Sequence, residues 1–303
     1  MRFSSRLPCR GSFDTLYPGM TKLDVFESVF RSADKPVYAH GRVKIARVLI
    51  VTDLSNAEAA PLVEQVRSFL SVLGEDLQWQ HLGGADFGSV GSLLEQVEGA
   101  APHLIVTYRH LHSDAWQWPH GLGEYLDVLT QATDIPVLVL PHPDADRALP
   151  HAVANTDCVM AITDHLTADA RLVDYALRLT APSGTCWLTH IESQQQFDHF
   201  LAAVEKIPEI ETEDVRQLVE AQLLKEPRDY IASCRKEIEA RGIPVKIEAI
   251  VAMGDRIEEY RRLVEDQRVD LLVLNTLDGD RLAMHGQAYP LAARLRGVPL
   301  LML

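Results

Sequence analysis

The stretch at residues 269–303, VDLLVLNTLDGDRLAMHGQAYPLAARLRGVPLLML, contains all the parts of one repeating unit of a parallel α/β protein. Its apolar run LLVL at 271–274 has the unbroken hydrophobicity of a strand that is covered on both faces. A loop rich in Asn, Asp and Gly follows, and a short helix is expected to begin near Ala288 and to end at Gly297. A proline then precedes a final apolar strand at 300–303. Loops at the carboxyl ends of such strands are where open α/β sheets bind ligands.

The same unit occurs earlier in the chain. A glycine stands thirteen residues before a proline in both places, at Gly123 and at Gly286. A second pair of segments, VLIVTD at 48–53 and VMAITD at 159–164, matches as well, and each is an apolar run that ends in Thr-Asp. Two segments repeated in the same order indicate two copies of one fold.

Composition limits the classes of function. The chain has 303 residues, with 29 basic and 43 acidic side chains and a formal net charge of −14. Nucleic-acid binding is not expected, because phosphate recognition needs clustered Lys and Arg. The cysteines form no CxxC pair, which is typical of buried thiols in a reducing compartment. No apolar run reaches the ~18 residues of a membrane span, and the N-terminus lacks the apolar part of a signal peptide, so we expect a cytoplasmic protein.

The chain divides into four parts. Residues 1–42 form an N-terminal extension, of which 1–19 are expected to be disordered, and Met20 is an alternative start to Met1. The first α/β domain spans 43–143 and has only four predicted strands, so it lacks one strand–helix pair. A linker at 144–156 leads to the second domain at 157–303.

Two expectations concern packing. The apolar closing strands of the two domains, at 137–140 and 300–303, are expected to pair within the chain, because exposed apolar edges invite pairing. The second domain is the longer one, and its additional residues lie mostly between 192 and 241, where helical patterns dominate. These patterns contain two apolar stripes that we expect in the core: Leu218, Val219, Leu223 and Leu224, then Ile231, Cys234 and Ile238.

Five segments of the second domain carry a family resemblance: ITDHLT at 162–167, TCWLTHIE at 185–192, IPVKIEAIVAMGD at 243–255, DLLVLNT at 270–276 and a Gly-x12-Pro pattern at 286–299. In this order they resemble the universal stress protein family, and together with the looser match of the first half they resemble its tandem two-domain type. The resemblance implies an α/β fold of two tandem doubly wound parallel-sheet domains of the HUP type, the first one shortened. It also implies that an adenine nucleotide often lies over the strand ends.

The resemblance further implies a set of cofactor-binding residues. In the family, an Asp after the first strand meets the adenine base, which gives that contact to Asp164 here and places Asp53 likewise in the first domain. Capping of the following helix is the alternative role. The family loop Gly-x2-Gly-x9-Gly-Ser/Thr brings backbone N–H groups to the phosphates. The predicted site residues are Thr163, Asp164, Asn275, Thr276, Gly279, Gly286 and Gln287.

The phosphate loop of this chain is degenerate. Asn275 replaces the first glycine, Gln287 replaces Ser or Thr, and Asp278 and Asp280 place carboxylates where phosphates would lie. Like charges ~4 Å apart repel by about 4 kcal/mol at an effective dielectric of about 20. We therefore expect AMP, adenosine or another small ligand to be favoured over ATP, with Mg²⁺ present only together with a nucleotide.

The corresponding loop of the first domain, YRHLHSDAWQWPH at 108–120, has lost the glycines. Four of its side chains form a candidate metal cluster, because His-x-His on an extended segment points both rings the same way: His110, His112, Asp114 and His120. A partly buried aromatic loop is the favoured interpretation, and a partner surface that uses Trp and His is a second alternative. We expect no metal site.

The sequence contains no recognised catalytic motif, and no catalytic residue is assigned. We expect a tandem universal-stress-type regulator that binds an adenine nucleotide or a related small ligand in its second domain and is not an enzyme. One alternative is an interaction protein that binds no nucleotide and acts on a partner such as a transporter or kinase. Slow ATP hydrolysis, which the family resemblance suggests, is a weaker alternative, and a homodimer is compatible with each of these functions.

Overall fold

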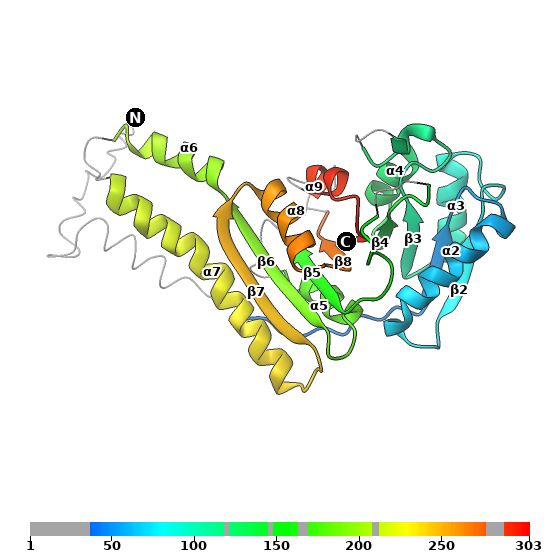
Figure 1. Ribbon diagram of the computed structural model, residues 1–303, viewed down its shortest axis with the longest axis horizontal. Coiled ribbons are helices and arrows are strands. Elements are labelled where there is room, and N and C mark those ends of the chain that lie inside the picture. Colours follow the sequence, from blue (N-terminus) through cyan, green and yellow to red (C-terminus); the bar gives the residue numbers. More distant parts are fainter. Residues whose placement is uncertain (1–36, 118–120, 145–147, 163–168, 208–211, 277–287) are drawn as a thin grey trace, which may run out of the picture. The chain divides into compact units, whose positions relative to one another are not determined.

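The computed structural model of the chain describes residues 37–117, 121–144, 148–162, 169–207, 212–276 and 288–303 (Figure 1). Its centre is a nine-stranded sheet with the order β2-β1-β3-β4-β9-β8-β5-β6-β7. The first half supplies β1 (Arg47–Val51), β2 (Gln78–Leu82), β3 (Leu104–Tyr108) and β4 (Val137–Leu140). The second half supplies β5 (Cys158–Ile162), β6 (Thr185–Ser193), β7 (Lys246–Gly254), β8 (Leu271–Leu274) and β9 (Leu300–Met302).

Helices cover both faces of this sheet. The first half contains α2 (Asn56–Phe69), α3 (Val90–Ala100), α4 (Glu124–Ala132) and the 3₁₀ turns η2 (Ser71–Leu73) and η3 (Asp114–Gln117). The second half contains α5 (Ala170–Leu179), α6 (Gln194–Val204), α7 (Thr212–Ala240), α8 (Arg256–Asp266) and α9 (Ala288–Arg294). Right-handed crossovers between parallel strands place α2, α5 and α7 on one face and α3, α4, α8 and α9 on the other. The contacts of α3 with α4, of α8 with α9, and of η2 with α5 agree with this arrangement.

The two halves meet through their closing strands. β4 and β9 pair antiparallel, with Val137 opposite Met302 and Val139 opposite Leu300, whereas all other neighbouring strands are parallel. The prediction that the closing strands pair within the chain is therefore confirmed. On either side of this pair the strands follow the same connectivity, and β7 has no counterpart in the first half. The α/β class and the shortened first half, predicted from the sequence, are both confirmed.

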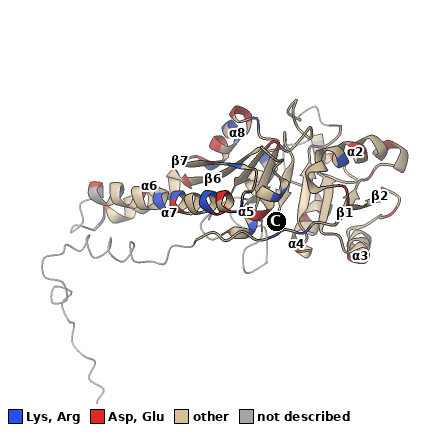
Figure 2. Cartoon of the chain, turned by 90° about the horizontal axis from the view of Figure 1, so that it is seen from below, with Lys and Arg blue, Asp and Glu red and all other residues tan. Residues whose placement is uncertain are grey.

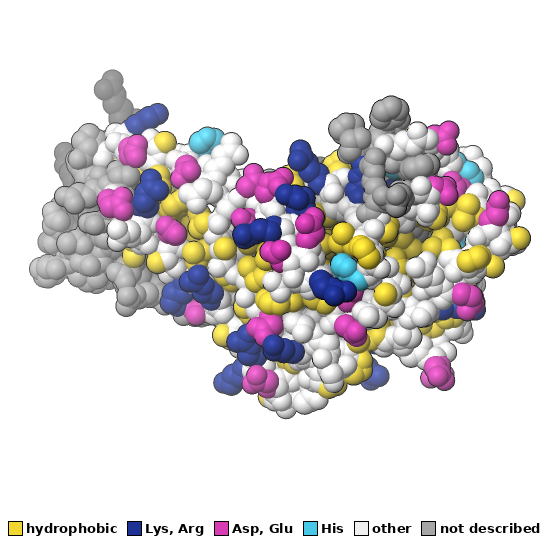
Figure 3. All heavy atoms as spheres, in the orientation of Figure 1, with side chains coloured by type: hydrophobic (Ala, Val, Ile, Leu, Met, Phe, Trp, Pro, Cys, Tyr) yellow, Lys and Arg dark blue, Asp and Glu magenta, His cyan; other side chains and the backbone are white. Residues whose placement is uncertain are grey.

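Strand composition explains why the core lies along the middle of the sheet. All residues of β3, β4, β8 and β9 are buried, and almost all are Leu, Ile or Val. Five helices, α2, α3, α5, α6 and α8, begin at a side-chain cap, and in α2 Ser55 and Glu58 form a reciprocal capping box. Lys, Arg, Asp and Glu lie largely on the helices, clearly so on α7 and α8 (Figure 2). Acidic and basic side chains are interspersed on the face drawn in Figure 3.

The additional residues of the second half form α6 and the beginning of α7. β6 and β7 pair over nine residues, whereas β5 pairs with β6 over five, so the two longer strands continue past the end of β5 toward α6 (Figure 1). The stripe Ile231, Cys234 and Ile238 is buried, as predicted. The prediction for the earlier stripe is wrong: Leu218, Val219, Leu223 and Leu224 are only half-buried. α7 begins away from the sheet, on the side of α6, and reaches the sheet only further along (Figure 1). Within the described ranges, no helix is both long and apolar enough to cross a membrane.

Candidate functional site

The carboxyl edge of the second half is the candidate site, because the direction of the crossovers reverses between β5 and β8. Two of the seven predicted site residues can be placed there. Asn275 and Thr276 follow directly after β8. The other five, Thr163, Asp164, Gly279, Gly286 and Gln287, lie outside the described residues, so their roles stay predictions.

Asn275 makes one hydrogen bond at this edge and has one unpaired atom. Its Nδ2 donates to Asp169 Oδ2 at 3.1 Å. The other oxygen of Asp169 accepts from the backbone N–H of Leu172 at 3.0 Å and caps α5. The capping role considered for Asp164 therefore belongs to Asp169. Burial raises the pKa of the Asp169 carboxyl above its ordinary value. The amide oxygen Oδ1 of Asn275 is buried and has no partner among the residues that the structure describes, which leave this hydrogen-bond acceptor unused at the switch point.

Tyr230 of α7 supplies a second unused polar atom. Its side chain is buried, and its hydroxyl has no hydrogen-bond partner in the described part of the chain. Burial raises the pKa of this hydroxyl, and Asp169 is among the neighbouring groups that raise it further, so the two side chains lie within electrostatic reach of one another. Asp169 therefore has Asn275 as a hydrogen-bonded neighbour and Tyr230 as an electrostatic one, and the three side chains come from separate elements. Buried polar atoms without partners are rare in proteins and call for an explanation such as a bound ligand or water.

Thr276 is placed differently. Its side chain is buried, and its hydroxyl donates to the carbonyl of Leu303 at 2.8 Å, while its backbone N–H donates to the same oxygen at 3.0 Å. These bonds attach the loop after β8 to the end of β9. The hydroxyl hydrogen of Thr276 is thus used within the protein, and its predicted contact with a ligand stays a prediction.

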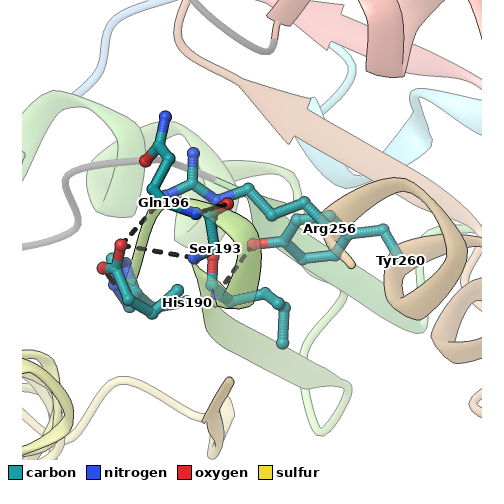
Figure 4. A network of polar contacts seen from close by, with 7 residues as sticks. His190, Ser193, Gln196, Arg256 and Tyr260 are labelled. Carbon is teal, nitrogen blue, oxygen red and sulfur yellow. Dashed lines mark hydrogen bonds and ion pairs between the residues drawn. The ribbon is translucent and has the colours of Figure 1, made fainter. Parts of the chain in front are cut away.

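A polar network lies at the end of β6 (Figure 4). His190 Nε2 and Glu192 Oε2 are 3.0 Å apart, and this hydrogen bond is the largest cause of a pKa of Glu192 below its ordinary value. Arg256 of α8 donates from Nε to the carbonyl of Ile191 at 2.7 Å and lies 3.5 Å from Glu192 Oε1. Tyr260 accepts from the N–H of Ile191 at 3.2 Å. The network holds the first turn of α8 against β6.

An open cavity of about 710 Å³ lies beside this network. Its lining comes from the first turns of α6 and α8 and includes Ser193, Gln194, Asp255 and Arg256. Ser193 and Asp255 cap the two helices with their own side chains, so both N-termini already have an internal acceptor. The cavity lies at the carboxyl edge and is lined largely by polar side chains. Arg256 in this lining is already engaged, because it donates to the carbonyl of Ile191 and lies close to Glu192.

The corresponding edge of the first half is closed by the protein's own side chains. Asp53 accepts from the Tyr108 hydroxyl with Oδ1 and from the backbone N–H of His112 with Oδ2, the latter at 2.6 Å. Burial, followed by the bond to Asp53, raises the pKa of the Tyr108 hydroxyl. Asp53 does not cap the next helix, because Ser55 does. Both carboxylate oxygens are therefore satisfied without a ligand.

The loop after β3 packs as an aromatic cluster. The ring of His112 lies 5.0 Å from that of Phe87 and 5.4 Å from that of Tyr125. His110 and His112 both have positive φ, 60° and 55°, and His110 is buried whereas His112 is exposed. The candidate metal ligand His120 lies outside the described residues. Within the described ranges, no group of three His, Cys, Asp or Glu side chains is arranged to hold a metal ion.

Strand register identifies the residue that differs between the two edges. Val48 of β1 lies opposite Leu104, and Val159 of β5 lies opposite Leu271. Counting from these pairs, Tyr108 and Asn275 occupy the same position in the two halves. The tyrosine reaches Asp53, whereas the shorter asparagine turns to Asp169. Asn275 was found from the sequence, but Asp169, Tyr230, Glu192 and Arg256 were not. No local signal marks those four, because they come together only through the fold.

No family model and no curated protein matches the chain. Solved structures include similar folds. A universal stress protein from Archaeoglobus fulgidus DSM 4304 has 11% identity and a TM-score of 0.49, covering 84% of this chain and 95% of its own. A functionally unknown protein from Pseudomonas aeruginosa PAO1 has 12% identity and a TM-score of 0.46, covering 86% of this chain and 92% of its own. Both TM-scores lie below 0.5, so the description of the fold rests on the strand order of the chain itself.

Proposed function

We propose that the protein is a regulator of the tandem universal stress type in which only the second half binds a small ligand, an adenine nucleoside or nucleotide with few phosphates. One observation carries the proposal: Tyr108 fills the first edge by bonding Asp53, whereas Asn275 at the same position of the second half leaves an acceptor unused. The ligand acts as a signal in this proposal, and no catalytic step is part of it.

The unused atoms of the second half favour a nucleobase. An amide oxygen accepts hydrogen bonds and a tyrosine hydroxyl donates or accepts, so Asn275 Oδ1 and Tyr230 Oη complement the exocyclic amine and a ring nitrogen of adenine. Leaving such a buried group unpaired costs about 1–3 kcal/mol. An adenine base that forms hydrogen bonds with both groups would remove this free-energy cost. Ligand binding should therefore stabilise this edge of the sheet.

Charge favours a ligand with few phosphates. The loop at 277–287 contains Asp278 and Asp280 in the sequence, and the whole chain carries a formal charge of −14. Each added phosphate increases the repulsion, so AMP or adenosine should bind more tightly than ATP unless Mg²⁺ bridges the phosphates and the carboxylates. The double variant Asp278→Gly/Asp280→Ser should therefore increase the affinity for ATP, most strongly without Mg²⁺.

Ligand extraction tests the proposal. The full chain is purified without added nucleotide and denatured, and the released small molecules are identified by mass spectrometry. We expect an adenine compound, or measurable binding of added AMP or adenosine to a chain that was purified empty. If no adenine compound is released and none binds at millimolar concentration, the ligand assignment is wrong.

A second candidate function, binding of a partner protein, rests on α6 and α7. Phe200 and Ile207 are 47% and 45% exposed, two of the few large apolar side chains in the described part of the chain with so much exposure. The half-buried stripe from Leu218 to Leu224 lies on the neighbouring helix. A transporter or kinase that responds to the ligand would find apolar contacts there. Cys158, Cys186 and Cys234 are free thiols, which supports our proposal of a reducing compartment, the cytoplasm.

A further inference from the structure

A second cleft lies at the amino edge of the second half, away from the candidate ligand site. Its volume is about 270 Å³. One wall is the segment at 37–46, here called the strap, and the opposite wall is the C-terminal part of α5. Val72 of η2 and the residues that lead into β7 close the remaining sides. The cleft is therefore built from both halves of the sheet and from the chain that precedes β1.

Three groups of the strap meet at a single carboxylate oxygen. Asp174 Oδ1 of α5 accepts from the Tyr38 hydroxyl at 2.5 Å and from the backbone N–H of Gly41 at 3.0 Å, and it lies 3.0 Å from His40 Nδ1. The backbone N–H of Tyr38 also donates to Ser233 of α7 at 3.1 Å. Asp174 contributes a carboxylate to the lining of the cleft. Its oxygen Oδ1 faces the strap, because the three strap groups named above contact it. The wall is consequently formed before any ligand arrives, which lowers the entropy cost of binding.

Two arginines contribute positive charge to the cleft. Arg178 is held by its own bonds, because Nη1 donates to the carbonyl of Val72 at 3.0 Å and Nη2 to that of Leu73 at 2.8 Å. Burial lowers the pKa of Arg178, and the charge of Arg42 lowers it further, so the two guanidinium groups repel each other. Arg42 is exposed and makes no ion pair with any residue that the structure describes. A bound anion would relieve this repulsion.

Apart from these groups, the lining is mainly apolar. Val43, Leu177, Ile243 and Val245 cover the cleft between the arginines and the start of β7. We propose that this cleft binds a small organic carboxylate that has an aliphatic or aryl body, with Arg42 and Arg178 facing the carboxylate and the apolar residues facing the body. The charge-assisted hydrogen bond to a guanidinium supplies specificity for the anion, and burial of the body supplies affinity. This inference is independent of the nucleotide site.

Calorimetric titration of the full chain with octanoate tests the inference, and 1-octanol serves as the neutral comparison. We expect saturable binding of octanoate, weaker binding of octanol, and loss of at least about fivefold in octanoate affinity in Arg42→Gln. Because Arg42 is exposed, this variant should fold normally, with an unchanged melting temperature. Lys44→Gln is the matched control, since it removes an exposed positive charge from the same strap but from outside the lining.

Three results would each overturn the inference. The first is the absence of saturable octanoate binding at millimolar concentration. The second is octanol binding as tightly as octanoate, which would show that only the apolar surface matters. The third is equal octanoate affinity in Arg42→Gln and Lys44→Gln, which would show that the net charge of the protein, and not the cleft, attracts the anion.

Discussion

At the scale of side chains, the hydrogen bonding of the two carboxyl edges differs at one residue position. Tyr108 is long enough for its hydroxyl to reach Asp53, and that bond together with the N–H of His112 satisfies the carboxylate. Asn275 stands at the same position in the second half, cannot reach so far, and bonds Asp169 instead. In the function that we propose, the side chain at this position decides whether an edge completes its own hydrogen bonds or leaves an acceptor for a ligand.

The bond between Tyr108 and Asp53 gives the first prediction. Tyr108→Phe keeps the ring but leaves an oxygen of the half-buried Asp53 carboxylate without its donor, so the free energy of unfolding should fall by about 1–3 kcal/mol. Urea unfolding measures the change. Tyr175→Phe is the control, because no hydrogen bond of the Tyr175 hydroxyl is present in the part of the chain that the structure describes. Equal stability of the two variants would show that the bond to Asp53 contributes nothing.

Arg109 gives a second prediction, on pH. Its side chain is 3% exposed, and Nη2 donates to the carbonyl of Leu295 at 3.2 Å, while Nε and Nη1 have no partner within the described ranges. Burial, together with nearby Arg296, lowers the pKa of Arg109 to about 9. A buried cation with a lowered pKa destabilises the folded protein while it is charged. As the pH rises through about 9, the folded protein loses this proton before the unfolded chain does, so the destabilisation fades.

Arg109→Met removes the charge at every pH. At pH 7.5 the variant should be at least as stable as the parent protein, because an unpaired buried charge is replaced by an apolar side chain of similar size. This advantage should shrink by pH 10, where the parent protein is itself partly uncharged at this position. Urea unfolding at the two pH values provides the comparison. A variant less stable by ~1 kcal/mol or more at pH 7.5, with the same difference at pH 10, would mean that Arg109 stabilises the fold as a cation.

At the scale of elements, the edge strand β7 is protected by the helix beside it. β7 ends the sheet and has one neighbour, β6, so its outer carbonyls lack strand partners. Arg235 of α7 donates from Nη2 to the carbonyl of Ile247 at 3.0 Å, and Arg228 from Nη2 to that of Val251 at 3.4 Å. Charged side chains over an edge strand are a common defence against pairing with other molecules.

Removal of this protection gives the third prediction. Arg235→Ala frees the carbonyl of Ile247, so we expect larger species than in the parent protein at equal concentration. Sedimentation velocity measures their proportion. Arg241→Ala removes a positive charge near the end of the same helix, where Arg241 bonds Glu237, and should leave the distribution unchanged. If both variants behave like the parent protein, the arginine is not what keeps this edge unpaired.

The sequence alone predicted some of the helices, strands and their contacts, but not all of them. Unbroken apolar runs predicted β3, β4, β8 and β9, because a strand that is covered on both faces is apolar at nearly every position. The repeated unit then predicted the order of elements, and the apolar edges of the closing strands predicted that these strands pair. The half-buried stripe on α7 was misjudged, since helical periodicity shows that one face is apolar and not what covers it. Tyr230 and Asp169 could not be predicted as neighbours, because sequence spacing carries no information on contacts between distant elements.

At the scale of the whole molecule, the antiparallel pair β4 and β9 joins the halves into one sheet. Leu138 and Leu301 lie opposite each other in this pair and are fully buried. Each half without the other would expose an apolar strand edge. The junction should therefore carry much of the stability of both halves, and the two should unfold together.

Variants of the junction give the fourth prediction. Leu301→Ala keeps the backbone pairing but leaves a cavity, and it should cost about 2–5 kcal/mol of unfolding free energy. Deletion of 300–303 removes β9 altogether, exposes the edges of β4 and β8, and should cause aggregation. Thermal unfolding followed by circular dichroism, with size-exclusion chromatography, measures both effects. A soluble truncated protein with an unchanged melting curve would show that the halves are stable without this pair.

The central claim is that one edge of the sheet is open to a ligand and the other is closed, and the stoichiometry of binding tests it most directly. Calorimetric titration of the full chain with AMP should give one site per chain. Tyr230→Phe, which breaks no hydrogen bond in the part of the chain that the structure describes, should weaken binding about three- to tenfold, and Tyr108→Phe should leave it unchanged. Two equivalent sites per chain, no binding, or an affinity that depends on Tyr108 and not on Tyr230 would contradict the claim.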